Sequence, residues 1–293
     1  MMALEPSHAG ATARRWTVAP GLVLATPAAL MGVVNVTPDS FSDGCRHDDP
    51  TAALAVATAM RAAGAAWIDL GGESTRPGAT AVTTAEELRR VLPAIAALVD
   101  LGLPISIDTS KAAVARAALA AGARMVNDVS AGADPEMFAT VAAAGCPLVL
   151  MHMQGTPATM QRAPLYADVV DEVHAFLAAR MAAAVAAGVR EDAIVLDPGI
   201  GFGKSLAHNL ALLRAVPALA AHSGRPLLLG VSRKAFLAVA AGVELPAAAR
   251  DGLSHLVHAA LAPHCALLRV HDIGGAAAAL RLSSALRATD GGR

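Results

Sequence analysis

Carboxylate, amide and ammonium side chains recur along this 293-residue chain directly after short apolar stretches. Carboxylates bind pairs of N–H groups, whereas asparagine and lysine meet ring nitrogen or oxygen atoms, so together they suit a planar heterocycle with an amidine-like edge. A buried carboxylate beside such a ring can also stabilise a developing cation. The residues with this chemistry are Asp108, Asn127, Asp197 and Lys234.

A second group of side chains suits a di-anionic leaving group. It consists of Asn35, Arg269 and His271, together with Arg76 from a loop. Asn35 is a candidate ligand for Mg2+, because magnesium is commonly held by one or two protein oxygens and by substrate phosphates. Ser232, which is expected to open a helix, offers a hydroxyl and backbone N–H groups to a further anion such as a carboxylate.

Each of these positions has a simpler explanation when it is taken alone. An aspartate or asparagine at the end of a strand is more often a helix cap or a turn former than a functional group. His271 could instead hydrogen-bond to Asp272 or to the backbone, and His152, which is flanked by methionines, is expected to be structural. Polar residues nevertheless follow every predicted strand, Asp69 included, and this recurrence favours a common site.

The apolar stretches predict eight buried strands that alternate with helices. Such alternation is typical of a parallel sheet with right-handed crossovers. Eight units in about 250 residues favour a closed (β/α)8 TIM barrel, whose active site lies at the carboxyl ends of the strands. An open doubly wound sheet would carry G-x-G-x-x-G after its first strand, and this chain does not. The strands are expected at residues 30–36, 67–70, 105–108, 125–126, 147–151, 194–196, 226–230 and 266–270.

Local signals refine this α/β architecture. We predict a single TIM-barrel domain over residues 21–293 after a flexible N-terminal extension over residues 1–20. A helix is expected to follow Thr84 as N-cap, with Glu87 completing a capping box. Three glycines precede Lys204, but their spacing differs from that of a P-loop, so a nucleotide phosphate loop is not expected there. Other histidines are expected on the surface or in packing roles: His255, His258 and His264.

Two connections are longer than usual and are candidate lids over a small aromatic substrate. They are expected over residues 36–50, which include Phe41, and over residues 71–83, which include Arg76 and Pro77. Closure of such loops would keep water away from a reactive cation. The simpler alternative is that they are surface loops without a function.

Composition narrows the partners and the compartment. The net charge is −1, so neither nucleic acid nor an anionic membrane is expected as a partner. Residues 16–38 carry no charge, but prolines and polar residues interrupt them, so no membrane span is expected. The three cysteines lie far apart without C-x-x-C spacing, which predicts a reduced, cytoplasmic setting.

Seven motifs lie at residues 35–44, 71–78, 106–111, 150–155, 197–204, 232–234 and 269–272. They closely resemble those of the dihydropteroate synthase family, in the same order, and the resemblance extends from about residue 30 to the end. The resemblance implies condensation of 6-hydroxymethyl-7,8-dihydropterin diphosphate with 4-aminobenzoate, a step of folate biosynthesis that releases diphosphate and gives 7,8-dihydropteroate. It also implies Mg2+, a homodimer and inhibition by sulfonamides.

The resemblance also implies a role for each matching residue. Ser232 would meet the aminobenzoate carboxylate, in a pocket formed in part by Phe41 and Pro77. Thr75 would contact the dihydropterin diphosphate. The pterin would be held by Asp108, Asn127, Asp197 and Lys234, and the diphosphate and metal by Asn35, Arg269 and His271.

Two other functions compete with this interpretation. A methyltetrahydrofolate:corrinoid methyltransferase would share the pterin-binding carboxylates but would have no use for the diphosphate group of side chains. A barrel that binds pterin without catalysis should have lost strand-end residues, and none is missing from the sequence.

Overall fold

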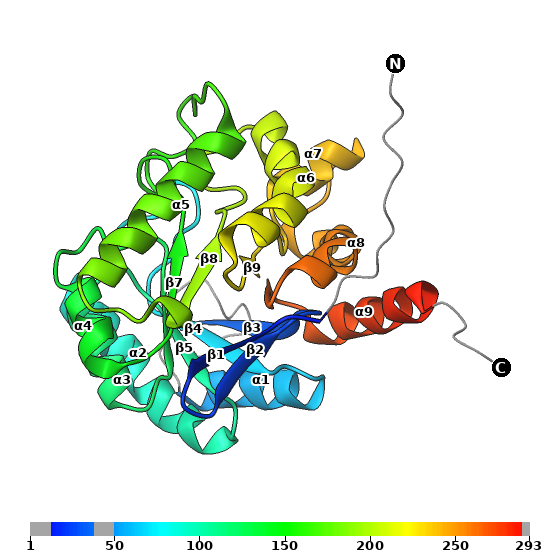
Figure 1. Cartoon of the computed structure of the whole chain (residues 1–293). Coiled ribbons are helices and arrows are strands. Elements are labelled where there is room, and N and C mark those ends of the chain that lie inside the picture. Colours follow the sequence, from blue (N-terminus) through cyan, green and yellow to red (C-terminus); the bar gives the residue numbers. More distant parts are fainter. Residues whose placement is uncertain (1–12, 38–49, 289–293) are drawn as a thin grey trace.

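Eight parallel strands form a barrel surrounded by helices (Figure 1). This computed structural model describes residues 13–37 and 50–288. The predicted TIM-barrel class is confirmed, because buried apolar runs alternate with helices along the described chain. The barrel strands are β3 (Ala29–Asn35), β4 (Trp67–Gly71), β5 (Ile105–Asp108), β6 (Met125–Asp128), β7 (Leu148–Met151), β8 (Ile194–Asp197), β9 (Leu228–Leu229) and β10 (Leu267–Val270).

The helices pack on the outside of the strands, and small side chains let them approach closely. Ala53 and Ala57 of α1, and Ala115 and Ala118 of α3, are fully buried. Two helices, rather than one, connect β9 to β10. The helices are α1 (Pro50–Ala62), α2 (Thr84–Leu98), α3 (Ala112–Ala120), α4 (Met137–Ala144), α5 (Val169–Ala186), α6 (Leu206–Ser223), α7 (Ala235–Ala241), α8 (Asp251–Leu261) and α9 (Ile273–Arg287).

The barrel has one weak seam, between β8 and β9. The strands pair in the order β8-β7-β6-β5-β4-β3-β10-β9, so β8 and β9 stand at the two ends of the ladder. A single bridge between Leu196 and Leu227 joins them, with the Leu196 N–H donating to Pro226 O at 3.0 Å. Strand β9 is shorter than the predicted 226–230, and Pro226 has no N–H to donate to a ladder.

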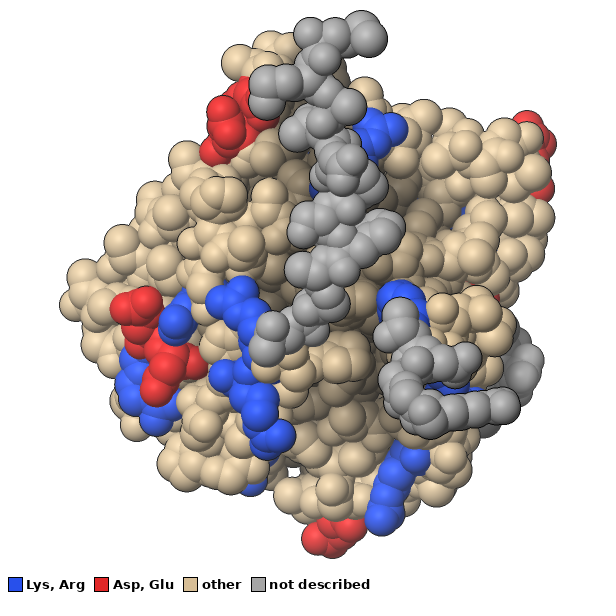
Figure 2. Space-filling view, turned by 45° about the vertical axis from the view of Figure 1, so that its right-hand side comes forward, with Lys and Arg blue, Asp and Glu red and all other residues tan. Residues whose placement is uncertain are grey.

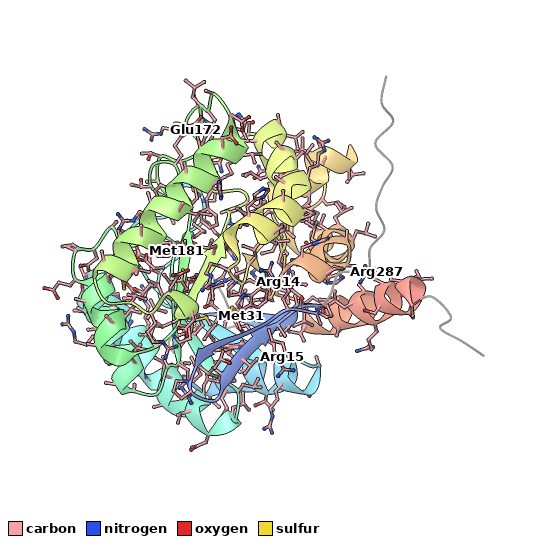
Figure 3. All side chains as sticks on the ribbon, viewed as in Figure 1. Arg14, Arg15, Met31, Glu172, Met181 and Arg287 are labelled. Atoms are coloured by element: carbon pink, nitrogen blue, oxygen red, sulfur yellow. The ribbon has the colours of Figure 1, made fainter. Side chains whose placement is uncertain are left out.

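An antiparallel hairpin of β1 (Arg15–Ala19) and β2 (Leu22–Ala25) covers the amino-terminal end of the barrel. Val18 and Leu24 pack against Met31 and other residues near the beginnings of the strands, and Met31 lies beside the hairpin at the middle of the barrel (Figure 3). The Trp16 indole N–H donates to Gly224 O at 3.0 Å. Residues 15–19 therefore belong to the folded unit, and the predicted boundary after residue 20 falls inside the hairpin.

The helix α2 begins one residue earlier than predicted. Thr83, not Thr84, is the N-cap, and its hydroxyl accepts from the Glu86 N–H at 3.2 Å. Glu87 takes no part in a capping box; it is fully buried and its carboxylate accepts from Lys111. Adjacent threonines give the same sequence signal, so the backbone geometry decides between them.

His258 has the packing role that was one of the two alternatives predicted for it, because its side chain is buried. Its side chain on α8 is 0% exposed, and neither ring nitrogen has a hydrogen-bond partner within the described residues. Burial lowers the pKa of His258 to about 3, so the ring is neutral in the folded protein and becomes charged only on unfolding below its ordinary pKa.

Replacing His258 by leucine is expected to stabilise the protein by about 1–2 kcal/mol at neutral pH, because two unpaired polar atoms leave the interior. The unfolded histidine binds a proton below about pH 6.5 and the folded one does not, so the gain should grow as the pH falls below that value. Urea unfolding at two pH values measures it. A variant that is less stable than the parent at both values would contradict this account.

Candidate active site

The carboxyl ends of the barrel strands surround a cavity. Most of the predicted residues line it, and apolar side chains of Val129, Met151 and Phe202 complete its wall. The strand register explains the gathering, because Asn35, Gly71, Asp108 and Asn127 pair in one row across β3 to β6. The predicted residues in the lining are Thr75, Asp108, Asn127, Asp197, Ser232, Lys234, Arg269 and His271.

Arg269 joins two buried carboxylates at this end of the barrel. Its Nε donates to Asp69 Oδ2 at 2.5 Å and its Nη2 donates to Asp108 Oδ2 at 2.7 Å. Asn127 Nδ2 also donates to Asp69 Oδ2, at 3.1 Å. Asp69 is 0% exposed and had no predicted role. Its place beside a predicted strand end was visible in the sequence, but the structure puts it in the middle of β4, and its partner lies 200 residues away.

Burial and charge set the protonation of this network. Burial raises the pKa of Asp108 to about 7, against the opposing effect of Arg269. Burial also disfavours the charge of Arg269, but Asp69 and Asp108 raise its pKa above the ordinary value, so the guanidinium stays charged. Asp108 is therefore a carboxyl group whose charge changes near neutral pH.

Asp197 and Lys234 face each other across the seam of the barrel. Asp197 Oδ1 accepts from the Gly199 N–H at 2.7 Å, and Lys234 Nζ donates to Ile200 O. Burial raises the pKa of Asp197, and Lys234 opposes that shift. Burial lowers the pKa of Lys234 to about 8, and Asp197 acts in the other direction. The pair thus places an acceptor and a donor in the lining of the same cavity.

Phe202 is a wall of the cavity that the sequence analysis did not identify. Lys234 Nζ lies 4.4 Å from the centroid of its ring, within the range of a cation–π contact. The ring also lines the cavity and offers an apolar face to a planar ligand. The available signal was an aromatic residue inside an otherwise glycine-rich turn.

The glycine-rich turn after β8 allows two close approaches. Gly199 has φ +67°, and a Cβ there would lie 1.8 Å from His152 O. Gly201 has φ +83°, and a Cβ there would lie 2.8 Å from Lys234 Cδ. Only glycine combines this backbone conformation with the missing side chain, so the turn sets where Lys234 can lie.

Lys204 lies at the end of this turn, and its ammonium group forms hydrogen bonds within the protein. Its side chain is buried, and Nζ donates to His152 Nδ1 at 2.9 Å and to Phe202 O at 3.0 Å. Burial lowers the pKa of His152 to about 3, so its ring is neutral and Nδ1 accepts. The predicted structural role of His152 is therefore confirmed, and Lys204 shares it.

Arg233 holds the backbone that presents Lys234. It is a non-glycine residue with φ +61°, a conformation that costs free energy unless its surroundings impose it. The Arg233 N–H donates to Ser254 Oγ at 3.0 Å, and its guanidinium donates to both oxygens of Asp251 at 2.8 Å. Helix α8 thus supports the turn between Ser232 and Lys234.

Ser232 and His271 contact each other. Ser232 Oγ accepts from the His271 backbone N–H at 3.1 Å and lies 2.9 Å from His271 Nδ1. Burial lowers the pKa of His271 to about 3, so the imidazole is neutral, and it can offer an anion an N–H donor but no positive charge. Helix α7 begins at Ala235 with Lys234 as N-cap, so Ser232 precedes the helix instead of opening it.

The remaining predicted residues that the structure describes lie on β3 and on the loop after β4, and most of them are outside the cavity lining. Asn35 is half-buried at the end of β3, in register with Gly71. Thr75 reaches the cavity, whereas Arg76 and Pro77 are exposed on the following part of the loop. Phe41 lies outside the described residues.

The family model for pterin binding enzymes matches residues 31–271 of this chain, the span that builds the barrel and the cavity. The chain belongs to the pterin binding enzyme family. Its members with related sequences include the dihydropteroate synthase of Mycobacterium leprae, which is 48% identical over 266 residues, covering 88% of this chain and 93% of that protein.

Two solved structures of Xanthomonas albilineans dihydropteroate synthase share the barrel. One, with 4-aminobenzoic acid, has a TM-score of 0.86 at 45% identity and covers 95% of this chain and all of the other. The second, in complex with 7,8-dihydropteroate, has a TM-score of 0.82 at 42% identity and covers 94% of this chain and all of the other. Solved structures of this relative thus hold 4-aminobenzoic acid in one case and 7,8-dihydropteroate in the other.

Proposed function

We propose that this chain is a transferase that condenses 6-hydroxymethyl-7,8-dihydropterin diphosphate with 4-aminobenzoate, giving 7,8-dihydropteroate and diphosphate. One observation carries the proposal: a single cavity combines a donor and acceptor group suited to a pterin with arginine and histidine suited to an anion. Relatives named dihydropteroate synthase at 42–48% identity support it.

In this proposal Asp108, Asn127 and Asp197 bind the N–H and ring edge of the pterin, and Lys234 donates to a ring heteroatom. Phe202 covers a face of the ring. The bond between the pterin methylene carbon and oxygen breaks, and its electron pair leaves with diphosphate. Asp108 and Asp197 stabilise the resulting cation, because buried carboxylates interact strongly with a developing charge.

The leaving diphosphate meets Arg269 from β10, the neutral His271 directly after that strand, and Arg76 from the loop after β4. The amine nitrogen of 4-aminobenzoate then forms the new C–N bond and loses one proton. Ser232 contacts the carboxylate of 4-aminobenzoate, and Phe41 with Pro77 forms part of the pocket for its ring. Sulfonamides, which resemble this substrate in shape, are proposed as inhibitors.

Asn35 fits a magnesium site completed by the substrate. The described residues contain no group of three or more His, Cys, Asp or Glu that could form an all-protein metal site. Asn35 offers one amide oxygen at the rim, and Mg2+ commonly takes one or two protein oxygens and several from phosphates and water. Bound Mg2+ would offset the charge on the leaving diphosphate.

The decisive experiment measures diphosphate release from the dihydropterin diphosphate with and without 4-aminobenzoate. Release that depends on 4-aminobenzoate, with 7,8-dihydropteroate as the product, is the expected result. Methyl transfer from methyltetrahydrofolate to a corrinoid without diphosphate release would instead favour the methyltransferase alternative. Binding of the pterin without either reaction would favour the barrel without catalysis.

The pKa shifts predict a narrow pH range for catalysis. The pKa of Asp108 is raised to about 7 and that of Lys234 is lowered to about 8. The carboxylate must be ionised and the ammonium protonated, so kcat/KM for the dihydropterin diphosphate should rise through about pH 7 and fall above about pH 8. Removing the nearby negative charge with Glu87→Gln should move the acid limb to lower pH, because Glu87 raises the pKa of Asp108. An acid limb that does not move would contradict this assignment.

We also propose a homodimer and a cytoplasmic location. Exposed apolar side chains on α7 to α9 form a candidate dimer face, and Figure 2, which brings this side forward, shows mostly uncharged surface with a few groups of basic and acidic side chains. Analytical ultracentrifugation is expected to give the dimer mass. The apolar residues are Val239, Leu256, Leu282 and Leu286.

No helix within the described ranges is both long and apolar enough to cross a membrane. The described cysteines, Cys146 and Cys265, are unpaired, as expected in a reducing compartment.

A further inference from the structure

We propose that Glu73 and Lys111 form a tether that positions Thr75 and Arg76 for the diphosphate of the substrate. The inference rests on the proposed function, in which Arg76 meets the leaving diphosphate and the cavity-lining Thr75 is expected to contact the same substrate. Neither Glu73 nor Lys111 reaches the reacting atoms in this scheme, so both are positioning residues.

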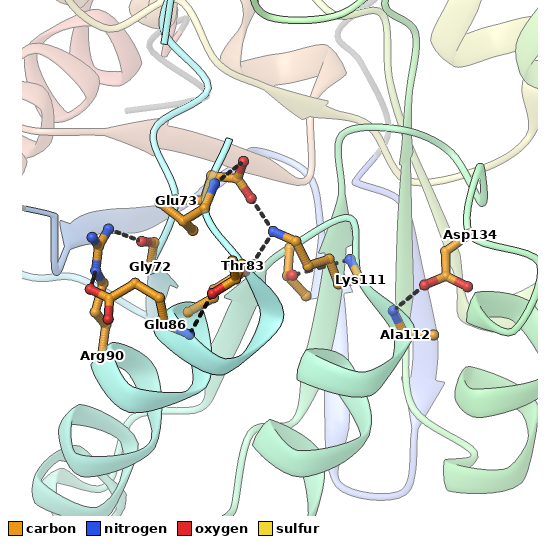
Figure 4. Close-up of polar contacts among 11 residues, drawn as sticks. Gly72, Glu73, Thr83, Glu86, Arg90, Lys111, Ala112 and Asp134 are labelled. Atoms are coloured by element: carbon orange, nitrogen blue, oxygen red, sulfur yellow. Dashed lines mark hydrogen bonds and ion pairs between the residues drawn. The ribbon is translucent and has the colours of Figure 1, made fainter. Parts of the chain in front are cut away.

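Glu73 closes the base of the loop that follows β4. One of its carboxylate oxygens accepts from the Val82 N–H at 3.3 Å, which joins the beginning of the loop to its end. The other accepts from Lys111 Nζ (Figure 4). A single carboxylate therefore holds both ends of the segment between residues 73 and 82 and attaches them to the neighbouring βα unit.

Lys111 also donates to a second carboxylate, that of Glu87 on α2. Its Nζ donates to Glu87 Oε2 at 2.5 Å, and Glu87 is 0% exposed. Lys111 follows Asp108 by three residues at the carboxyl end of β5. The base of the loop is thus bound to the element that carries the central carboxylate of the cavity.

A further contact fixes the residue before Glu73. Arg90 Nη1 donates to Gly72 O at 2.9 Å, and Arg90 Nε donates to Glu86 at 2.7 Å (Figure 4). Beyond this base, the Gly78 N–H donates to Pro157 O at 3.1 Å. Thr75 lies between these two attachments, close to the tether, so its place at the cavity depends on residue 73 being held.

The tether does more than neutralise a buried charge. The Lys111–Glu87 contact already compensates the buried Glu87, whereas the Glu73 carboxylate is 19% exposed and would be hydrated without a partner. Its contacts instead restrict the loop. Ordering a flexible loop on binding weakens affinity, and a loop that is already ordered avoids that cost.

Glu73→Ala tests the proposal, because it releases the loop and leaves the Lys111–Glu87 contact intact. The KM for the dihydropterin diphosphate should rise on the order of tenfold, with kcat at saturation changed by less than about threefold. Glu73→Gln keeps one acceptor oxygen for Val82 and should recover part of the loss. Arg116→Met, which removes the exposed Arg116–Glu136 ion pair, is the matched control and should leave both constants unchanged.

Hydrogen exchange of the free protein gives a readout that does not need activity. The amides of residues 74–82, Val82 above all, should exchange faster in Glu73→Ala than in the parent, while the melting temperature stays close to that of the parent. Unchanged exchange together with an unchanged KM would overturn the tether, as would a loss confined to kcat. An inactive parent protein would count against the proposed function, and the exchange result would still decide whether the tether exists.

Discussion

Asp108→Asn is expected to lower kcat/KM for the dihydropterin diphosphate by about 10²–10³-fold, the effect of losing one electrostatic contact to a transition state. Asparagine keeps the shape of the side chain but removes its negative charge. Its amide oxygen can still accept from Arg269, which donates to the Asp108 carboxylate at 2.7 Å. The loss should therefore appear in catalysis and not in folding.

Steady-state kinetics and thermal unfolding separate these two effects. Asp100→Asn makes the same chemical change at an exposed position and should leave kcat/KM unchanged. The Asp108 variant should remain folded, because the change removes a charge from a residue that is only 6% exposed and the fully buried Asp69 still pairs with Arg269. Activity within about threefold of the parent would show that Asp108 has no electrostatic role.

Gly199→Ala is expected to destabilise the protein by about 3 kcal/mol or more. The added methyl group meets His152 O at 1.8 Å, and this carbonyl belongs to backbone that cannot move without shifting the end of β7. The positive φ of +67° adds strain of about 1–2 kcal/mol for any L-residue other than glycine. The turn must therefore rearrange or the protein unfolds more easily.

Gly242→Ala is the matched control for this substitution. Gly242 has φ +68° at the end of α7, but no atom lies within 4 Å of the added Cβ. Its loss should be limited to the backbone strain of about 1–2 kcal/mol. Chemical denaturation of both variants gives the difference between them, and equal losses would mean that the contact with His152 O is relieved at no cost.

The barrel and most of its rim follow from local sequence patterns. A short apolar run marks each strand, and the next polar residue lies at the carboxyl end, where parallel strands bring such residues together. Asp108, Asn127 and Asp197 therefore needed no long-range information to be placed in one cavity. The predicted limits of β9 were too wide. Pro226 and Gly230 lie at the ends of the apolar run, and only Leu228 and Leu229 form the strand.

Contacts between residues that lie far apart in the sequence could not be predicted from local patterns. The Arg269–Asp69 ion pair joins β10 to β4 across the intervening strand β3, so it depends on the order of the strands in the barrel, and either residue alone has many possible partners. The hairpin of β1 and β2 was also missed, although Pro20-Gly21 between two apolar runs is a turn signal. Its burial is decided by the open end of the barrel that it covers, which has no local signature.

The seam between β8 and β9 links ligand binding to the stability of the whole barrel. Asp197 ends β8 and Lys234 follows β9, and little more than the Leu196–Leu227 bridge joins the two strands directly. A ligand that contacts both side chains therefore adds a cross-link where the ladder of hydrogen bonds is thinnest. The pterin would act as a structural part of the cylinder, and the free protein should open first along this line.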